Sequence, residues 1–237
     1  MLALLTTAGC GHRAPARPVA APAPTTAPVV RPALPDVLDP LLGGSVAHPR
    51  EALTVYDRPD GKPLRTLGLR TALDGPQGLL VAKYAPGWVL LHLPMRPNTA
   101  TGWVRQSLVT ITVDPWSIQV SRAQHLLIVR RSGTVTARYP VAIGAPATPT
   151  PAGLFYVTDL IATGDPHGAF GPAALGLSGR SDVIKQFAGA DGVLGIHGTS
   201  AQWSVGRSVS HGCIRMRNAD SLTLLGTVPV GTPVVIT

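Results

Sequence analysis

The chain has 237 residues, which is enough for one large domain or two small ones with a hydrophobic core. Its net charge of +8 at pH 7 should attract polyanions such as nucleic acid, anionic lipid or acidic polymers. The sequence has no helix-turn-helix, zinc-finger or RNP pattern and no Lys/Arg stripe interleaved with aromatics, which argues against nucleic acid. No apolar stretch approaches the ~20 residues that a membrane-spanning helix requires.

The N-terminal region predicts an export signal followed by a tether. Residues 1–10, MLALLTTAGC, form a short apolar run that ends in small residues and resembles the end of a bacterial lipoprotein signal, with Cys10 as the lipidated residue. Residues 11–45 are rich in Ala, Pro and Thr without an apolar period, which is typical of an extended, disordered tether. We therefore expect an exported protein of the cell envelope, lipid-anchored at the outer face of the cytoplasmic membrane. The alternative is an apolar N-terminus and an extension without any targeting role.

Residues 46–113 predict a small all-β module. Short apolar runs such as GLLVAKY and WVLLHL are separated by turn signals, notably RPDGK at 58–62. GWVLLHLPMRPNTATGWV resembles the bacterial SH3-like modules found beside cell-wall enzymes. Trp88, Trp103 and Tyr84 could line a ligand groove, but tryptophans in so small a barrel more often pack in the core, so no site is predicted here.

Residues 114–237 predict a second module, mostly β with little helix. Runs of strand length occur at residues 116–121, 124–144, 152–160, 193–198, 208–216 and 231–237. RRSG predicts a hairpin turn between two β-branched runs. NADSLTLLG predicts a short helix with Asn218 as its N-cap and a glycine at its end.

Residues 208–218, SVSHGCIRMRN, contain Cys213, one of two cysteines in the chain. A disulfide to Cys10 would join the signal region to a distant strand, and the partner is lost if Cys10 is lipidated or removed. A zinc site could use His197, His211 and Cys213, but no fourth ligand lies at the usual spacing. An inert buried cysteine and a nucleophile remain as alternatives.

The residues around Cys213 have the chemistry that a nucleophilic cysteine requires. Cysteine attacks as the thiolate, so it needs a base, which His197 can supply, or a positive neighbour such as Arg215. On one strand, His211 and Cys213 would project to the same side. Gly212 would leave a backbone N–H exposed to an oxyanion.

Residues 196–218, IHGTSAQWSVGRSVSHGCIRMRN, resemble the signature of the YkuD-type L,D-transpeptidases: a histidine, a spacer, Ser-His-Gly-Cys and then an asparagine. VAIGAPATPTPAGLFYVTD resembles the family's Gly/Pro/Thr-rich approach to a strand, and PAALGLSG resembles its active-site wall. The resemblance covers essentially all of residues 114–237. Relatives often carry an aromatic residue where this chain has Ala173. This difference bears on how tightly the pocket binds the donor substrate.

The resemblance implies a β-rich YkuD-like catalytic domain after the SH3-like barrel, and peptidoglycan L,D-transpeptidase activity. Cys213 would attack the carbonyl of the L-centre of a diamino acid in a stem tetrapeptide, expel D-alanine and form a thioester. An amine of a neighbouring stem would then resolve the thioester to a 3-3 cross-link. The resemblance implies no cofactor and no metal, and it implies that carbapenems acylate Cys213.

The resemblance also implies roles within the motif. His197 would be the base, with the Gly198 carbonyl orienting its ring as an Asp side chain does in serine triads. His211 and the N–H groups of Gly212 and Cys213 would hold the oxyanion and the substrate. The residues assigned to the loop or the stem peptide are Ser210, Arg215 and Asn218. For Arg215 the alternative is a structural hydrogen-bond bracket, and for Asn218 it is the helix cap.

Two other functions stay open from the sequence. An L,D-carboxypeptidase would use the same Cys213 with water as the acceptor, because the acceptor depends on water exclusion and groove shape. A wall-binding protein would rely on the SH3-like module and have an idle catalytic domain. The intact set of His197, His211, Gly212 and Cys213 argues against an idle domain.

Overall fold

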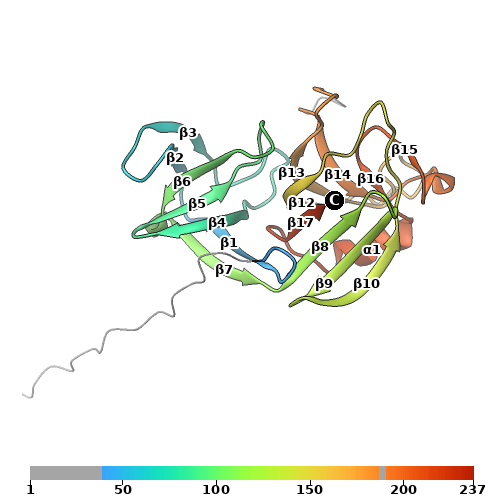
Figure 1. Ribbon diagram of the computed structural model, residues 1–237, viewed down its shortest axis with the longest axis horizontal. Helices are drawn as coiled ribbons and strands as arrows, with labels where there is room; N and C mark the ends of the chain where they lie inside the picture. Colours follow the sequence, from blue (N-terminus) through green and yellow to red (C-terminus); the bar gives the residue numbers. More distant parts are fainter. Residues whose placement is uncertain (1–38, 187–190) are drawn as a thin grey trace, which may run out of the picture. The chain divides into compact units, whose positions relative to one another are not determined.

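The computed structural model describes residues 39–186 and 191–237 (Figure 1). Cys10, the predicted signal and the predicted tether up to residue 38 lie outside the described residues. The described part consists mainly of β-strands with one short α-helix, which confirms the predicted fold class. None of its helices has the length and apolar character needed to cross a bilayer.

The first sheet is antiparallel and has the strand order β3-β2-β6-β5-β4-β1-β7. Its strands are β1 (Gly44–Pro49), β2 (Leu53–Tyr56), β3 (Pro63–Leu67), β4 (Leu79–Ala85), β5 (Trp88–His92), β6 (Thr101–Arg105) and β7 (Val109–Asp114), with the 3-10 turn η1 (Gln106–Leu108) before β7. The pattern of apolar runs did not predict β3, because only Leu67 of this edge strand is buried. It also did not predict β1, whose first residues the sequence placed in the tether. The SH3-like identity of this module stays a prediction.

The second sheet is mixed and has the strand order β10-β9-β8-β17-β12-β13-β14-β16. Its strands are β8 (Trp116–Ser121), β9 (Leu126–Arg131), β10 (Thr134–Pro140), β12 (Gly153–Ala162), β13 (Ala173–Arg180), β14 (Val193–His197), β16 (Ile214–Arg215) and β17 (Pro233–Ile236). The pairs β17–β8 and β14–β16 are parallel. A separate parallel pair is formed by β11 (Ile143–Gly144) and β15 (Ser208–Ser210). The remaining elements are the 3-10 turn η2 (Gln202–Ser204) and the helix α1 (Asn218–Leu225).

The predicted RRSG turn connects β9 to β10 in the structure. Its central residues Ser132 and Gly133 have φ angles of 48° and 80°. Positive φ at both central positions is the geometry of a type I′ turn, whose twist matches that of the flanking strands. The hairpin prediction is therefore confirmed.

Each sheet packs its own hydrophobic core, and β12 of the second sheet also contributes to the core of the first. Tyr156 of β12, in the second sheet, is fully buried among the core residues of the first sheet. Its hydroxyl donates a hydrogen bond to the carbonyl oxygen of His92 at 3.2 Å. The boundary between the modules is thus packed like an interior, and it fixes the loops of the first module against the second sheet.

Candidate active site

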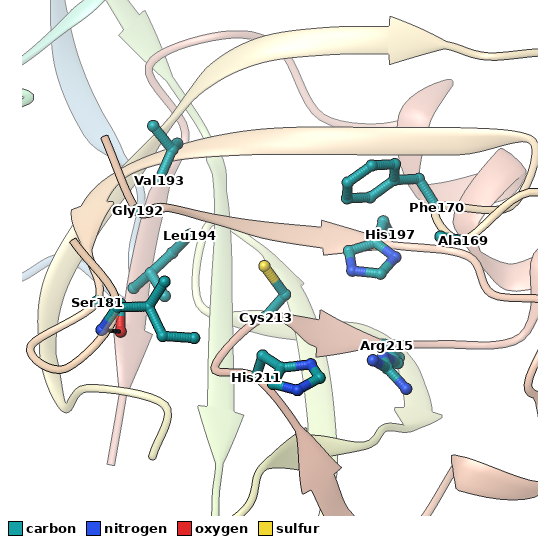
Figure 2. Close-up of a pocket in the computed structure, with 11 residues that line it drawn as sticks. Ala169, Phe170, Ser181, Gly192, Val193, Leu194, His197, His211, Cys213 and Arg215 are labelled. Carbon is teal, nitrogen blue, oxygen red and sulfur yellow. Dashed lines mark hydrogen bonds between the residues drawn. The ribbon is translucent and has the colours of Figure 1, made fainter. Parts of the chain in front are cut away.

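Adjacent parallel strands bring the predicted base and nucleophile together. In the register of β14 and β16, Ile196 faces Ile214 and His197 faces Arg215, and Cys213 directly precedes β16. Figure 2 shows Cys213 and His197 gathered with His211 and Arg215 around one pocket. The long spacer of the motif is therefore the connection between two neighbouring strands.

The prediction of one continuous strand over residues 208–216 is wrong. β15 ends at Ser210 and β16 begins at Ile214, and between them Gly212 has a φ of +116°. A residue with this backbone angle ends an extended run, and L-residues rarely adopt it. His211 and Cys213 therefore do not share a strand face, but the turn still places both in the wall of the same pocket.

The side chain of Ser210 closes this turn. Its hydroxyl donates to the Cys213 carbonyl at 2.6 Å and accepts the Gly212 N–H at 3.1 Å. Ser210 is buried and lines neither of the pockets described below, and its contact with the substrate stays a prediction. The Gly212 N–H is therefore engaged within the turn. The Cys213 N–H has no backbone acceptor among the described residues.

The loop of residues 145–152 supports this turn through hydrogen bonds. Thr150 Oγ1 accepts the Gly144 N–H and donates to the Gly212 carbonyl, each at 2.8 Å. Thr148 Oγ1 donates to the Ser210 carbonyl at 3.1 Å. A side chain on Gly144 would meet the backbone of residues 148–150 at 2.7 Å or less. The Gly/Pro/Thr-rich segment noted in the sequence therefore supports the turn that leads to Cys213.

His197 is buried, with 4% of its surface exposed. Its Nδ1 forms a hydrogen bond with the Gly198 carbonyl. A carbonyl only accepts hydrogen bonds, so Nδ1 carries the hydrogen and Nε2 keeps a free lone pair. Burial lowers the pKa of His197 to about 4, and Arg215 acts in the same direction while the Gly198 hydrogen bond opposes them. The imidazole is therefore neutral at physiological pH and able to accept a proton.

Gly198 occupies a position that has no room for a side chain. A Cβ there would lie 2.5 Å from Asn218 Oδ1 and 2.9 Å from Ser221 Oγ. Its N–H donates to the Ala173 carbonyl at 3.0 Å. The tight packing fixes the carbonyl that orients the His197 ring.

Asn218 positions this region from outside both pockets. Its Oδ1 accepts the Thr199 N–H at 2.7 Å, and its Nδ2 donates to the Pro166 carbonyl at 2.9 Å. The helix α1 is confirmed, but Asn218 is its first residue and not its cap. These bonds link two loops, which is one of the two roles expected for Asn218, and its contact with the stem peptide stays a prediction.

Cys213 is free, and burial governs its acidity. Burial raises the pKa of the thiol, while a backbone hydrogen bond from Gly195 and the charge of Arg215 act in the lowering direction. Arg215 therefore contributes in the direction expected from the sequence, but desolvation is the largest effect. The resting pair is thus a neutral thiol beside a neutral imidazole. Within the described residues, no group of three or more His, Cys, Asp or Glu residues could hold a metal ion.

Two pockets meet at Cys213. The first has a volume of about 290 Å³ and the second about 270 Å³. The side chains shared by both are Phe170, Val193, Leu194, His197 and Cys213. Only the first contains His211 and Arg215, and the Arg215 Nε is buried without a partner in the described part of the chain. Cys213 is therefore reached from two pockets that are both lined mainly by apolar surface, and the first of them also contains a cationic side chain.

Phe170 is a site residue that the sequence interpretation missed. Its ring packs edge-on against the His197 ring, with centroids 5.0 Å apart and planes at 74°. Ala173 is fully buried and lines neither pocket. The aromatic wall next to the base thus comes from Phe170, and the only signal for it was an aromatic residue between glycines in GAFG.

Comparison with known proteins agrees with the geometry of the site. The model of the YkuD L,D-transpeptidase catalytic domain matches residues 115–236. YkuD of Bacillus subtilis is 39% identical over 122 residues, covering 52% of this chain and 66% of that protein. YqjB of the same organism is 36% identical over 135 residues, covering 52% of this chain and 72% of that protein. Both carry the name L,D-transpeptidase, and the match spans about two thirds of these curated relatives.

Among solved structures, L,D-transpeptidase 3 from Mycobacterium tuberculosis in complex with a faropenem-derived adduct is 17% identical. The match covers 68% of this chain and 91% of that one, with a TM-score of 0.43. We assign the family from the match over residues 115–236 and from the curated relatives. The chain belongs to the YkuD family of L,D-transpeptidase catalytic domains.

Proposed function

We propose that the protein is a peptidoglycan L,D-transpeptidase that forms 3-3 cross-links through a thioester on Cys213. The observation that carries this proposal is the meeting of two pockets at the Cys213 side chain. A transpeptidase must bring an acyl donor and an amine acceptor to the same sulfur. One pocket can hold the donor, and the other can hold the acceptor.

In the first step, His197 Nε2 takes the proton from the Cys213 thiol as the sulfur attacks the donor carbonyl. Base assistance is necessary because burial raises the pKa of the thiol and leaves little thiolate at rest. The Cys213 N–H stabilises the oxyanion. The C–N bond then breaks, and D-alanine leaves with the proton returned by His197.

The donor fits the first pocket best. The bond to D-alanine lies next to a terminal carboxylate, and Arg215 lines this pocket. A guanidinium satisfies a carboxylate with charge-assisted hydrogen bonds. His211, exposed in the wall of the same pocket, faces the same ligand.

The second pocket distinguishes the transpeptidase from the carboxypeptidase. Water needs no pocket of about 270 Å³ to reach a thioester. A cavity of this size that contains both the nucleophile and the base is suited to an organic amine. We therefore favour transfer over hydrolysis as the main outcome.

The same acylation chemistry applies to β-lactams. The strained carbonyl of a carbapenem is an electrophile that the Cys213 thiolate can open, with the ring nitrogen retained in the adduct. The ring carboxylate would occupy the place of the donor carboxylate beside Arg215. We expect one covalent adduct per chain, on Cys213.

The test is incubation of the full chain with purified muropeptide tetrapeptides and identification of the products by mass. Cross-linked dimer together with free D-alanine supports the proposal. Tripeptide with D-alanine and no dimer would identify a carboxypeptidase. Recovery of unchanged tetrapeptide would contradict both enzymatic functions and favour a wall-binding protein.

We also propose that the protein acts outside the cytoplasmic membrane, anchored by a lipid on Cys10. The proposal rests on the sequence of residues 1–10, which lie outside the described part, and on the location of stem-peptide chemistry in the envelope. Expressed in a bacterium, the full chain should partition into detergent, and Cys10→Ser should move it to the aqueous phase. Equal partitioning of the two proteins would refute the anchor.

A further inference from the structure

The loop between β3 and β4 of the first module reaches the second pocket. Leu73 in this loop lines the pocket that also contains Cys213 and His197. The leucine is nevertheless 62% exposed, which is unusual for a large apolar side chain in a cavity wall. It therefore forms an outer edge that a bound ligand would cover.

Hydrogen bonds fix this loop on the catalytic sheet. Thr71 Oγ1 donates to Asp159 Oδ1, and Asp159 belongs to β12 and is 8% exposed. Thr71 and Gly75 close the loop through a bond from the Thr71 N–H to the Gly75 carbonyl at 2.9 Å and one from the Gly75 N–H to Thr71 Oγ1 at 3.0 Å. Leu73 lies at the tip of this closed turn. Its position relative to the pocket is therefore set by the structure and not by a free loop.

The lining of the second pocket favours an aliphatic amine. Its described walls contain no side chain that is charged at physiological pH, since the shared His197 is neutral, and Thr163 supplies the only hydroxyl. Apolar surroundings lower the pKa of an ammonium group, because they disfavour its charged form. An attacking amine must be neutral. This pocket can therefore both bind the acceptor and favour its neutral, reactive form. The first pocket contains Arg215, which we assign to the donor carboxylate.

We infer that Leu73 determines acceptor specificity by covering the aliphatic side chain of the acceptor's diamino acid in the second pocket. This inference rests on the proposed function. The amine nitrogen attacks the thioester carbonyl, and a C–N bond forms while the C–S bond breaks. His197 takes the proton from the nitrogen and returns it to the departing Cys213 sulfur. The first module then supplies part of the substrate site of the second.

The test is a comparison of acceptors in a two-stage assay. The full chain is first acylated with a stem tetrapeptide, and D-alanine release is measured. The acyl-enzyme is then given either a stem tetrapeptide, whose amine ends a long aliphatic side chain, or glycine. For Leu73→Ala we expect the ratio of dimer to hydrolysed tripeptide to fall about tenfold, since covering a leucine side chain stabilises a complex by an amount of that order. The preference for the long acceptor over glycine should shrink by the same factor.

Leu64→Ala is the matched control, because Leu64 is a similarly exposed leucine of the same module and lines neither pocket. Leu64→Ala should keep the wild-type ratio, and Leu73→Met should restore most of it. Normal D-alanine release with an unchanged ratio and acceptor preference in Leu73→Ala would overturn the inference and leave the proposed function intact. Absence of D-alanine release by the wild-type protein would refute the proposed function and this inference with it.

Discussion

The two sheets contribute to one active site in different ways. Cys213, its base and Arg215 all come from two neighbouring strands of the second sheet and the turn beside them. The first sheet contributes no reacting group among the described residues, but one of its loops lines the second pocket and another forms hydrogen bonds with residues that line the first. The proposed reacting groups therefore come from one short segment of the sequence, whereas the shape of the pockets around them depends on residues more than a hundred positions away.

The first pocket depends on the first module through Arg96. Its guanidinium forms an ion pair with Asp191 and donates to the Ser181 carbonyl at 3.0 Å. Asn98 also exchanges two hydrogen bonds with the backbone of Arg180, at 2.9 and 2.8 Å. Ser181 lines the first pocket. The first module therefore supports the outer wall of one pocket and completes the wall of the other.

The largest effect should come from Cys213→Ala. Loss of the sulfur removes the acyl carrier, so both D-alanine release and carbapenem acylation should fall to background while the melting temperature changes little. Intact-protein mass after carbapenem treatment checks this, with wild type gaining one adduct. An adduct of equal yield on the Cys213→Ala protein would mean that another residue is the nucleophile.

His197→Ala should slow acylation by ~10²–10⁴-fold, the usual cost of losing a general base. The pKa of His197 is about 4, so Nε2 is unprotonated above about pH 5 and the wild-type rate should be level near neutrality. Without the base, the rate must follow the thiolate fraction, which rises tenfold per pH unit below the pKa of the thiol. The deficit of His197→Ala should therefore shrink as pH rises.

His211→Ala is the control for this pH experiment. His211 stabilises charge on the substrate in our assignment, so its loss should slow acylation by a factor that alkali does not restore. Acylation rates of both variants between pH 6 and 10 decide the assignment. Alkaline rescue of His211→Ala alone would exchange the roles of the two histidines.

Gly198→Ala should have a smaller effect, of about 10–100-fold on acylation, through misplacement of the base. The new methyl group would lie 2.5 Å from Asn218 Oδ1, so the carbonyl that holds His197 must move. Gly226→Ala is the control, because its nearest contacts lie at 3.7 Å. Equal acylation rates for the two variants would show that the Gly198 carbonyl does not orient the base.

Arg96→Ala should have the smallest effect on the chemistry, slowing acylation by less than about tenfold through a less ordered pocket wall. The free energy of unfolding should fall by about 1–2 kcal/mol, because carbonyl groups lose a charged donor at a partly exposed position. Arg58→Ala, at an exposed ion pair within the first module, should change neither quantity. A loss of activity as large as that of His197→Ala would contradict the division of roles between the sheets.

The residues that the sequence analysis proposed as reacting groups lie together in the structure, and they could be proposed because a short motif contains them. The spacing of His197, Gly198 and Cys213 followed from one segment and needed no knowledge of the fold. The backbone around them was harder to predict, because Gly212 interrupts what an alternating pattern describes as a strand. The polar side chain of Ser210 makes its hydrogen bonds within the turn that results. Leu73 could not be predicted, because an exposed leucine has no signature until packing places it beside a distant cysteine.

The most direct test of the central claim is mass analysis of the full chain during its reaction with a stem tetrapeptide. The account predicts a transient adduct with the mass of the tripeptide acyl group, located by peptide mapping on the segment that contains Cys213. It predicts one D-alanine released per adduct and conversion of the adduct to cross-linked dimer on addition of acceptor. Cross-linked dimer formed by the Cys213→Ala protein, or an adduct on any other segment that proceeds to dimer, would contradict the account.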